Sequence, residues 1–301
     1  MSRVSVILAA RNERHLPRMV AHLQERLRGD YEILVVQDGP PYQRLPDHPR
    51  LRVFNRDYAG LKPSVNFAAQ QATGKYLFKL DSHCAISDGA DVLLQAEIEP
   101  NWMVVPRFYT MAENEWGPDK RKPHNDYWLL DCPLTDPRGY RFKAGGYWFA
   151  RTEARAGIGP LDETMTHHGS AWFVHRSFFL DSLRGMQADG YGVNYMEPAD
   201  LGLRTWLGPW AGKVMVNKAV WYAHLHQDHR ARGYPVDWPE VKRSYLWTAN
   251  HWMRNQWPEA VKPLAWLIER FWPVPTWPDN WQDLQAQYER DHPMGETERA
   301  A

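Results

Sequence analysis

The sequence has few of the features that mark a secreted or membrane-bound protein. Its 301 residues include two cysteines, Cys84 and Cys132, which are too few for a disulfide framework and favour a reducing compartment. No apolar signal region precedes the strand-like segment that begins at Val4, and no later apolar run reaches the length of a membrane span. We therefore expect a cytoplasmic protein that works without a membrane partner.

The sequence also lacks net charge, and it lacks tryptophan in its first hundred residues. Lysine plus arginine and aspartate plus glutamate both number 36, so only a local basic patch could attract nucleic acid. The first of the sixteen tryptophans is Trp102, and eight of them follow Arg232. Flat aromatic faces fill cores and also stack on sugars and bases. This asymmetry indicates that a ring-shaped substrate is handled by the later two-thirds of the chain.

Apolar strands alternate with helices over the first ninety residues. We expect strands at residues 4–8, 32–36, 51–54 and 76–80, and helices at residues 16–27 and 63–72. This alternation predicts an α/β fold with a doubly wound, mostly parallel sheet. Polar clusters at residues 10–13, 37–39 and 81–83 follow three of the strands. Because ligands bind beyond the carboxyl ends of such strands, the three clusters predict one site.

The rest of the chain changes character twice. Residues 98–165 are predicted to be rich in loops, and helical signals return at residues 171–183 and 200–207. Beyond Arg232 the tryptophans and prolines predict a helical extension that packs through aromatic anchors. We therefore expect a catalytic domain over residues 1–230 and an aromatic-rich helical extension over residues 231–301.

The most informative segment is LFKLDSHC, residues 77–84. Asp81 and His83 are two residues apart at the end of a strand, so their side chains lie on the same side of the extended chain. An oxygen ligand beside an imidazole nitrogen suits Mn²⁺ or a similar divalent ion. The segment therefore predicts a metal site at the edge of the sheet.

The early motifs, VSVILAARNE and EILVVQDG, resemble the start of family 2 glycosyltransferases, which have the GT-A fold. The resemblance implies that Ala9, Arg11 and Glu13 line the uracil base and that Asp38 binds the uracil or the ribose. The following stretch, GLKPSVNFAAQQATGKYLFKLDSHC, resembles the polypeptide N-acetylgalactosaminyltransferases, which carry Asp-x-His. This second resemblance adds three further candidates on the donor side: Lys62, Asn66 and Ser82.

Three later motifs agree with this resemblance. They are GSAWFVHRSFF, which matches a strand and helix start that cradle the donor sugar, EPADLGLRTW and WYAHLH. The second motif implies that Glu197 and Asp200 orient sugar or acceptor hydroxyls and that Arg204 braces them. The third implies His224 as a third ligand to Mn²⁺ or Mg²⁺, with His226 as the alternative. In relatives the next segment closes on the diphosphate, which implies a phosphate contact from Arg230 or Arg232.

Together these residues predict a metal-dependent hexosyl- or N-acetylhexosaminyl-transferase with a UDP-sugar donor. In inverting family members an aspartate that serves as base follows the helix glutamate, but here Pro198 holds that position and cannot take a proton. In retaining relatives the departing diphosphate accepts the proton of the acceptor. Pro198 therefore favours retention of the anomeric configuration.

The sequence leaves the acceptor open between two cases. One is Ser or Thr of a polypeptide, or a glycan. The other is a hydroxymethylated pyrimidine in duplex DNA, because an anchorless chain with this extension resembles glycosyltransferases of tailed phages and would act in a bacterial or phage-infected cell. Duplex DNA would need a basic face, for which the candidates are Lys120, Arg121, Lys122, Arg138, Arg141 and Lys143.

Two other function classes remain as alternatives. A nucleotidyltransferase would share the sheet and the metal aspartate, but it would need a glycine-rich phosphate loop that AARNERH does not offer. A carbohydrate-binding module without catalysis would not need Asp81, His83 and His224 to converge. The sequence does not indicate the oligomeric state.

Overall fold

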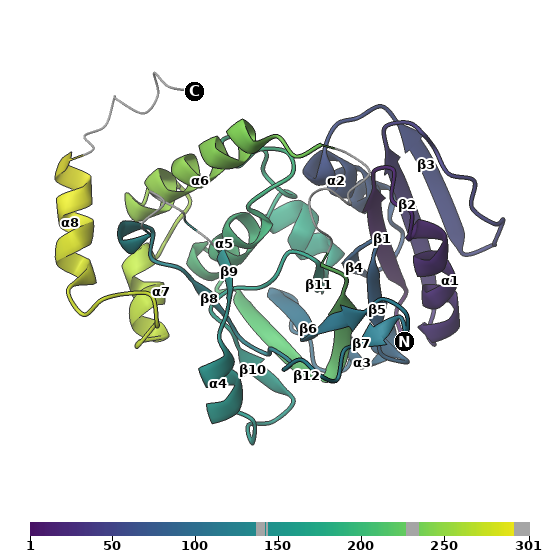
Figure 1. Ribbon diagram of the computed structural model, residues 1–301, viewed down its shortest axis with the longest axis horizontal. Helices are drawn as coiled ribbons and strands as arrows, with labels where there is room; N and C mark the ends of the chain where they lie inside the picture. Colours follow the sequence, from purple (N-terminus) through teal and green to yellow (C-terminus); the bar gives the residue numbers. More distant parts are fainter. Residues whose placement is uncertain (137–141, 143, 227–234, 292–301) are drawn as a thin grey trace.

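The computed structural model describes residues 1–136, 142, 144–226 and 235–291. Within these residues a 10-stranded mixed sheet forms the centre of the molecule (Figure 1). Its strands follow the order β10-β12-β6-β11-β4-β1-β2-β3, with β5 paired to β12 and β7 paired to β6. Five residues that the sequence predicts as basic contacts lie outside the described residues: Arg138, Arg141, Lys143, Arg230 and Arg232.

The first half of the sheet confirms the predicted α/β alternation. The strands are β1 (Val4–Ala10), β2 (Tyr31–Asp38), β3 (Leu51–Arg56) and β4 (Tyr76–Asp81), all parallel in the order β4-β1-β2-β3. The helices between them are α1 (Leu16–Arg26) and α2 (Leu61–Gln71). Both faces of β1 are covered, because Ile7 belongs to one hydrophobic cluster while Val6 and Leu8 belong to the other. This two-sided burial explains the continuous apolar runs of the sequence.

The second half of the sheet adds to one prediction and corrects another. Residues 98–165 are rich in loops, as predicted, but they also contain the long strand β6 (Trp102–Ala112). Residues 171–183 are not one helix, because β11 (Ala171–His175) pairs antiparallel with β4 and β6, and only the π-helical turn Phe178–Ser182 follows it. The other strands are β5 (Cys84–Ile86), β7 (Gly117–Pro118), β10 (Leu161–Glu163), β12 (Lys213–His224) and a separate pair, β8 (Trp128–Leu130) with β9 (Ala144–Tyr147).

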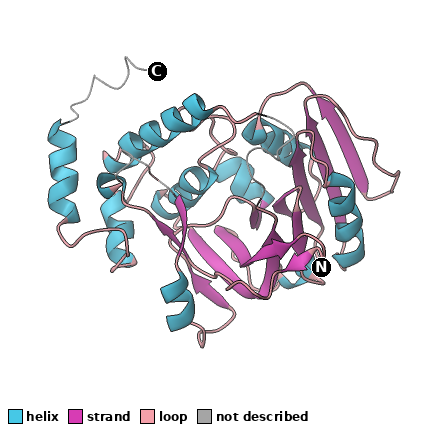
Figure 2. Cartoon of the chain, viewed as in Figure 1, coloured by secondary structure: helices cyan, strands magenta, loops and turns pink. Residues whose placement is uncertain are grey.

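Helices cover both faces of the sheet (Figure 2). The cluster on one face contains residues of α1 and of α3 (Ala90–Leu93). The cluster on the other face contains residues of α2, of α5 (Leu203–Leu207) and of the C-terminal helices α6 (Trp238–Met253), α7 (Leu264–Arg270) and α8 (Trp281–Asp291). Three short helical segments complete the set: Pro133–Thr135, α4 (Phe149–Ala154) and Pro198–Gly202.

The C-terminal region is helical, and its tryptophans pack against the same core as the sheet. Trp252, Trp277 and Trp281 are buried in that core. Figure 1 shows α6, α7 and α8 together on the side of the molecule away from α1 and β3. Among the described residues, no helix is both long enough and apolar enough to span a membrane.

Candidate active site

The polar clusters at the ends of β1, β2 and β4 meet at one cavity, as the sequence predicts for an open α/β sheet. The cavity has a volume of about 500 Å³ and lies at the carboxyl ends of β1, β4 and β12. Asp81 is the last residue of β4, His83 follows it, and His224 is the last residue of β12. One possible ligand atom from each of these residues lies within 4.8 Å of the other two. The fold therefore brings together the residues that the sequence predicts as metal ligands.

The donor atoms of this triad fit a divalent cation. His224 Nε2 lies 3.2 Å from Asp81 Oδ2 and 3.1 Å from His83 Nε2. Ligand bonds of about 2.1 Å place neighbouring ligand atoms of an octahedron about 3 Å apart. Burial lowers the pKa of His224 to about 4 despite the nearby Asp81, so its imidazole is neutral at pH 7, as a metal ligand must be.

Glu13 orients one of the imidazoles. His83 Nδ1 lies 2.9 Å from Glu13 Oε2, so Nδ1 donates to the carboxylate and Nε2 faces the triad with its lone pair. A histidine that ligates a metal commonly donates its other ring N–H to a carboxylate in this way. The sequence predicted that Glu13 lines the base, and the structure adds this contact with His83.

A buried lysine joins the triad to the acidic helix start. Lys79 Nζ lies 2.7 Å from Asp81 Oδ1 and 3.2 Å from Glu197 Oε1, and it donates to the Gly169 carbonyl at 2.6 Å. The Oε1 contact has ion-pair distance but not the geometry of a hydrogen bond, so this buried oxygen keeps its hydrogen-bonding capacity. Burial alone would lower the pKa of Lys79, but the carboxylates of Asp81 and Glu197 outweigh burial and raise it.

The two carboxylates respond differently to this environment. Burial would raise the pKa of Asp81, but Lys79 and the two imidazoles outweigh it, so the pKa lies well below its usual value. For Glu197 burial prevails over the attraction of Lys79, and the pKa is raised. Asp81 therefore stays ionised, as a metal ligand must, while Glu197 lines the cavity as the less acidic group.

The predicted nucleotide side lies along the same cavity. Ala9, Arg11, Asp38 and Ser82 all line it, together with Glu13. The guanidinium carbon of Arg11 lies 3.9 Å above the centre of the Tyr58 ring. The Asp38 carboxylate accepts hydrogen bonds from the backbone N–H groups of the two residues before α2, at 2.8 and 2.9 Å. Asp38 thus fixes the loop that precedes α2 as well as facing the cavity.

Four predicted residues lie beneath the cavity and do not line it. Asp200 is fully buried, and Arg204 Nε donates to its Oδ1 at 2.7 Å, so Arg204 contacts one member of the acidic pair that it was predicted to brace. Lys62 Nζ lies 3.8 Å from Asp200 and donates to a backbone carbonyl, and Asn66 exchanges two hydrogen bonds with the backbone of Met186. In this arrangement these side chains contact protein groups, and their predicted substrate contacts remain predictions.

Two residues beside the triad were not predicted. Lys79 is buried and does not line the cavity, and its signal in the sequence was a lysine inside an apolar strand on the same side as Asp81. His168 lines the cavity from the loop before β11, and its ring centre lies 5.3 Å from that of His224. The alternative ligand, His226, also lines the cavity, but its Nε2 lies 3.0 Å from the Tyr147 hydroxyl.

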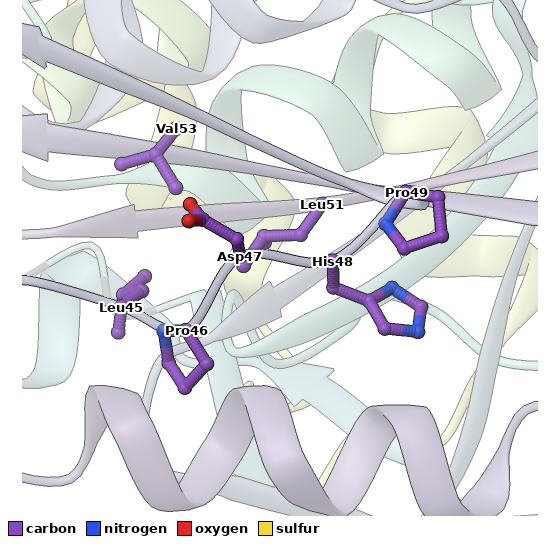
Figure 3. A pocket seen from close by; sticks show the side chains of 7 residues that line it. All are labelled: Leu45, Pro46, Asp47, His48, Pro49, Leu51 and Val53. Carbon is purple, nitrogen blue, oxygen red and sulfur yellow. The ribbon is translucent and has the colours of Figure 1, made fainter.

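A second cavity, of about 520 Å³, lies at the outer edge of the sheet, between the β2–β3 loop and β3. Figure 3 shows its lining residues, among which the Asp47 carboxylate and the His48 ring point in different directions. Because its two ionisable side chains do not converge, this cavity offers no catalytic arrangement. The chemistry of the described residues is concentrated at the triad.

Comparisons with known proteins indicate the family and support the fold. A family model described as Glycosyl transferase family 2 matches residues 5–177. A search of curated proteins found no match. The chain is similar to the crystal structure of GalNAc-T7 with UDP, GalNAc and Mn²⁺, with a TM-score of 0.65 and 16% identity over 90% of this chain. It spans 56% of that protein's chain.

A second solved structure is also similar, S. aureus TarS 1-349 in complex with UDP-GlcNAc. Its TM-score is 0.50, with 14% identity over 88% of this chain and 69% of that chain. At these sequence identities the two structures support the fold of the chain only.

Proposed function

Because the chain belongs to glycosyl transferase family 2 and has the GT-A fold, we propose that it transfers a sugar from a UDP-sugar to an acceptor hydroxyl with the help of a divalent cation. The observation that carries the proposal is the convergence of Asp81, His83 and His224 in the cavity that Ala9, Arg11 and Asp38 also line. Solved structures similar to this chain bind UDP with Mn²⁺, or UDP-GlcNAc, which supports the choice of donor.

The cation would be Mn²⁺ or Mg²⁺, held by Asp81, His83 and His224. When bound, such an ion neutralises the negative charge of a diphosphate leaving group. The chain's own residues prepare the site for it: Glu13 fixes the tautomer of His83, and Lys79 keeps Asp81 ionised. The mixture of one carboxylate oxygen and two imidazole nitrogens supports Mn²⁺ over Ca²⁺.

In the transfer, the bond between the sugar C1 and the β-phosphate oxygen breaks, and a bond between C1 and the acceptor oxygen forms. The proton of the acceptor hydroxyl moves to the departing diphosphate, which leaves as UDP. Glu197 lines the cavity, where its carboxylate can accept a hydrogen bond from a sugar or acceptor hydroxyl. Pro198 follows it and has no group to take a proton, which supports retention of configuration.

The acceptor is a hydroxyl of a glycan, of a polypeptide or of a hydroxymethylated base in phage-type DNA. For the DNA case, the basic segment at residues 120–122 is the nearest described candidate, because the charge of Lys122 adds to burial in lowering the pKa of His226. Arg121, however, is already paired with Asp119 at 2.8 Å. Neither Lys120 nor Lys122 lines the cavity within the described residues.

The test is turnover of a panel of UDP-sugars, with and without Mn²⁺, by wild-type protein and by Asp81→Ala and His83→Ala. Both variants should lose transfer activity almost completely, and EDTA should abolish the activity of the wild-type protein. Asp47→Ala and His48→Ala are matched controls in the cavity at the outer edge of the sheet and should keep full activity. Near-normal turnover by Asp81→Ala at saturating Mn²⁺ would refute the metal assignment.

A further inference from the structure

One face of α6 forms a wall of the same cavity that contains the triad. Trp238, Val241 and Tyr245 line the cavity, together with Val236 just before the helix. Their spacing of three and then four residues places the three helical side chains on one face of the helix. The predicted extension therefore contributes to the site and is not only a scaffold beside it.

Trp238 differs from the other tryptophans of this region. Of the eight that follow residue 232, three are buried in the core and three are partly buried against it. Trp272 is 38% exposed and does not line the cavity, whereas Trp238 is 59% exposed and does. Core packing therefore explains the buried tryptophans and leaves Trp238 without that explanation.

The later, buried turns of α6 hold this face in position. Ser244, Thr248 and Trp252 are buried on the helix, and Trp252 Nε1 donates to the Tyr191 hydroxyl at 2.9 Å. At the start of the helix the Asp237 side chain accepts from the Glu240 N–H at 3.0 Å. A capped and packed helix loses little backbone freedom when a ligand stacks on its side chains.

The chemistry of this wall indicates the class of ligand. None of the charged residues near Trp238 lines the cavity: the Asp237 side chain caps the helix, Glu240 accepts from the Val193 N–H at 3.1 Å, and Lys242 and Arg243 are also absent from the lining. Within the described chain, this wall is thus apolar and aromatic and offers no cation to a polyanion. Such a wall suits an uncharged ring that carries hydroxyl groups.

We propose that Val236, Trp238, Val241 and Tyr245 form the acceptor subsite, which takes an uncharged sugar ring stacked on the Trp238 indole. This inference rests on the proposed glycosyltransferase function and names the acceptor class. The apolar C–H face of a sugar matches the indole, while its hydroxyl groups reach Glu197 on another side of the cavity.

The experiment compares Trp238→Ala, Trp238→Phe and the control Trp272→Ala. The acceptors are methyl glycosides of glucose, galactose and N-acetylglucosamine, and a duplex that contains hydroxymethylcytosine. Loss of a stacking face should raise the KM for the sugar acceptor about 5- to 100-fold in Trp238→Ala, because stacking contacts are worth roughly 1–3 kcal/mol. Trp238→Phe should recover most of this loss, Trp272→Ala should match wild type, and the KM for the UDP-sugar should change far less.

Two results would overturn the inference. One is an acceptor KM in Trp238→Ala equal to that of wild type. The other is a wild-type enzyme that modifies the hydroxymethylcytosine duplex, or only hydrolyses the UDP-sugar, and glycosylates none of the sugars. Both are distinct from failure of the proposed function, in which wild-type protein neither binds UDP by calorimetry nor turns over any UDP-sugar.

Discussion

Replacing Lys79 by methionine should destabilise the protein and make its stability depend on the metal. Lys79 lies 2.7 Å from Asp81 and 3.2 Å from Glu197, which at an effective dielectric constant of about 20 gives attractions of about 6 and 5 kcal/mol. The substitution also removes the cost of burying the ammonium group, so the net loss in the free energy of unfolding should be about 3–5 kcal/mol. Two buried carboxylates would then face each other without a cation.

Mn²⁺ should recover more of this stability in Lys79→Met than in wild type. A cation bound at Asp81 replaces part of the missing positive charge, and ligand binding to the folded state adds stability by mass action. The assay is urea unfolding with EDTA and with Mn²⁺. Lys62→Met is the matched control, because Lys62 is equally buried but pairs with Asp200 beneath the cavity. Equal Mn²⁺ stabilisation of all three proteins, or a Lys79→Met variant as stable as wild type, would refute the reasoning.

Three further predictions follow from the same contacts. Gly169→Ala should lower the rate of transfer at least about tenfold with little loss of stability. The new Cβ would lie 2.7 Å from Glu197 Oε2 and push that flexible carboxylate aside. An unchanged kcat/KM would contradict this prediction. Burial lowers the pKa of Lys62 to about 8, so the unfolded chain binds more protons than the folded chain between pH 8 and about 10.5. The free energy of unfolding of wild type should therefore rise by up to about 3 kcal/mol relative to that of Lys62→Met as the pH rises through this range. A difference between the two proteins that does not change with pH in urea unfolding would show that the pKa is normal. Pro198 predicts a product with the anomeric configuration of the donor, and NMR coupling constants at the product's anomeric proton would reveal inversion instead.

The first half of the fold could be predicted from the sequence because its pattern is local. Strands buried on both faces read as continuous apolar runs, and the predicted segments at 4–8, 32–36 and 76–80 lie inside β1, β2 and β4. The second half has weaker local signals. Pro106 and Arg107 interrupt the apolar sequence pattern of β6, and a proline in a sequence argues against a central strand. The five residues of β11 are too few for periodicity to separate a strand from a helix.

The candidate site shows the same division. Asp81 and His83 are close in sequence and mark a strand end, so their pairing could be predicted from the sequence alone. His224 could be placed beside them only through a resemblance, because its position depends on how β12 enters the sheet. The partnership of Lys79 with Glu197, and the wall formed by α6, depend on packing between distant segments, which no local pattern encodes.

The wall on α6 has a consequence for how the proposed acceptor preference of this protein could change in evolution. The side chains proposed to meet the acceptor come from residues 236–245, a stretch separate from the strands that carry the triad and the nucleotide side. Further along the helix, the buried Thr248 and Trp252 anchor it, so substitutions at the cavity end leave the anchor intact. A library of variants confined to positions 236, 238, 241 and 245 should therefore yield new acceptor preferences without changing which UDP-sugar is used as donor.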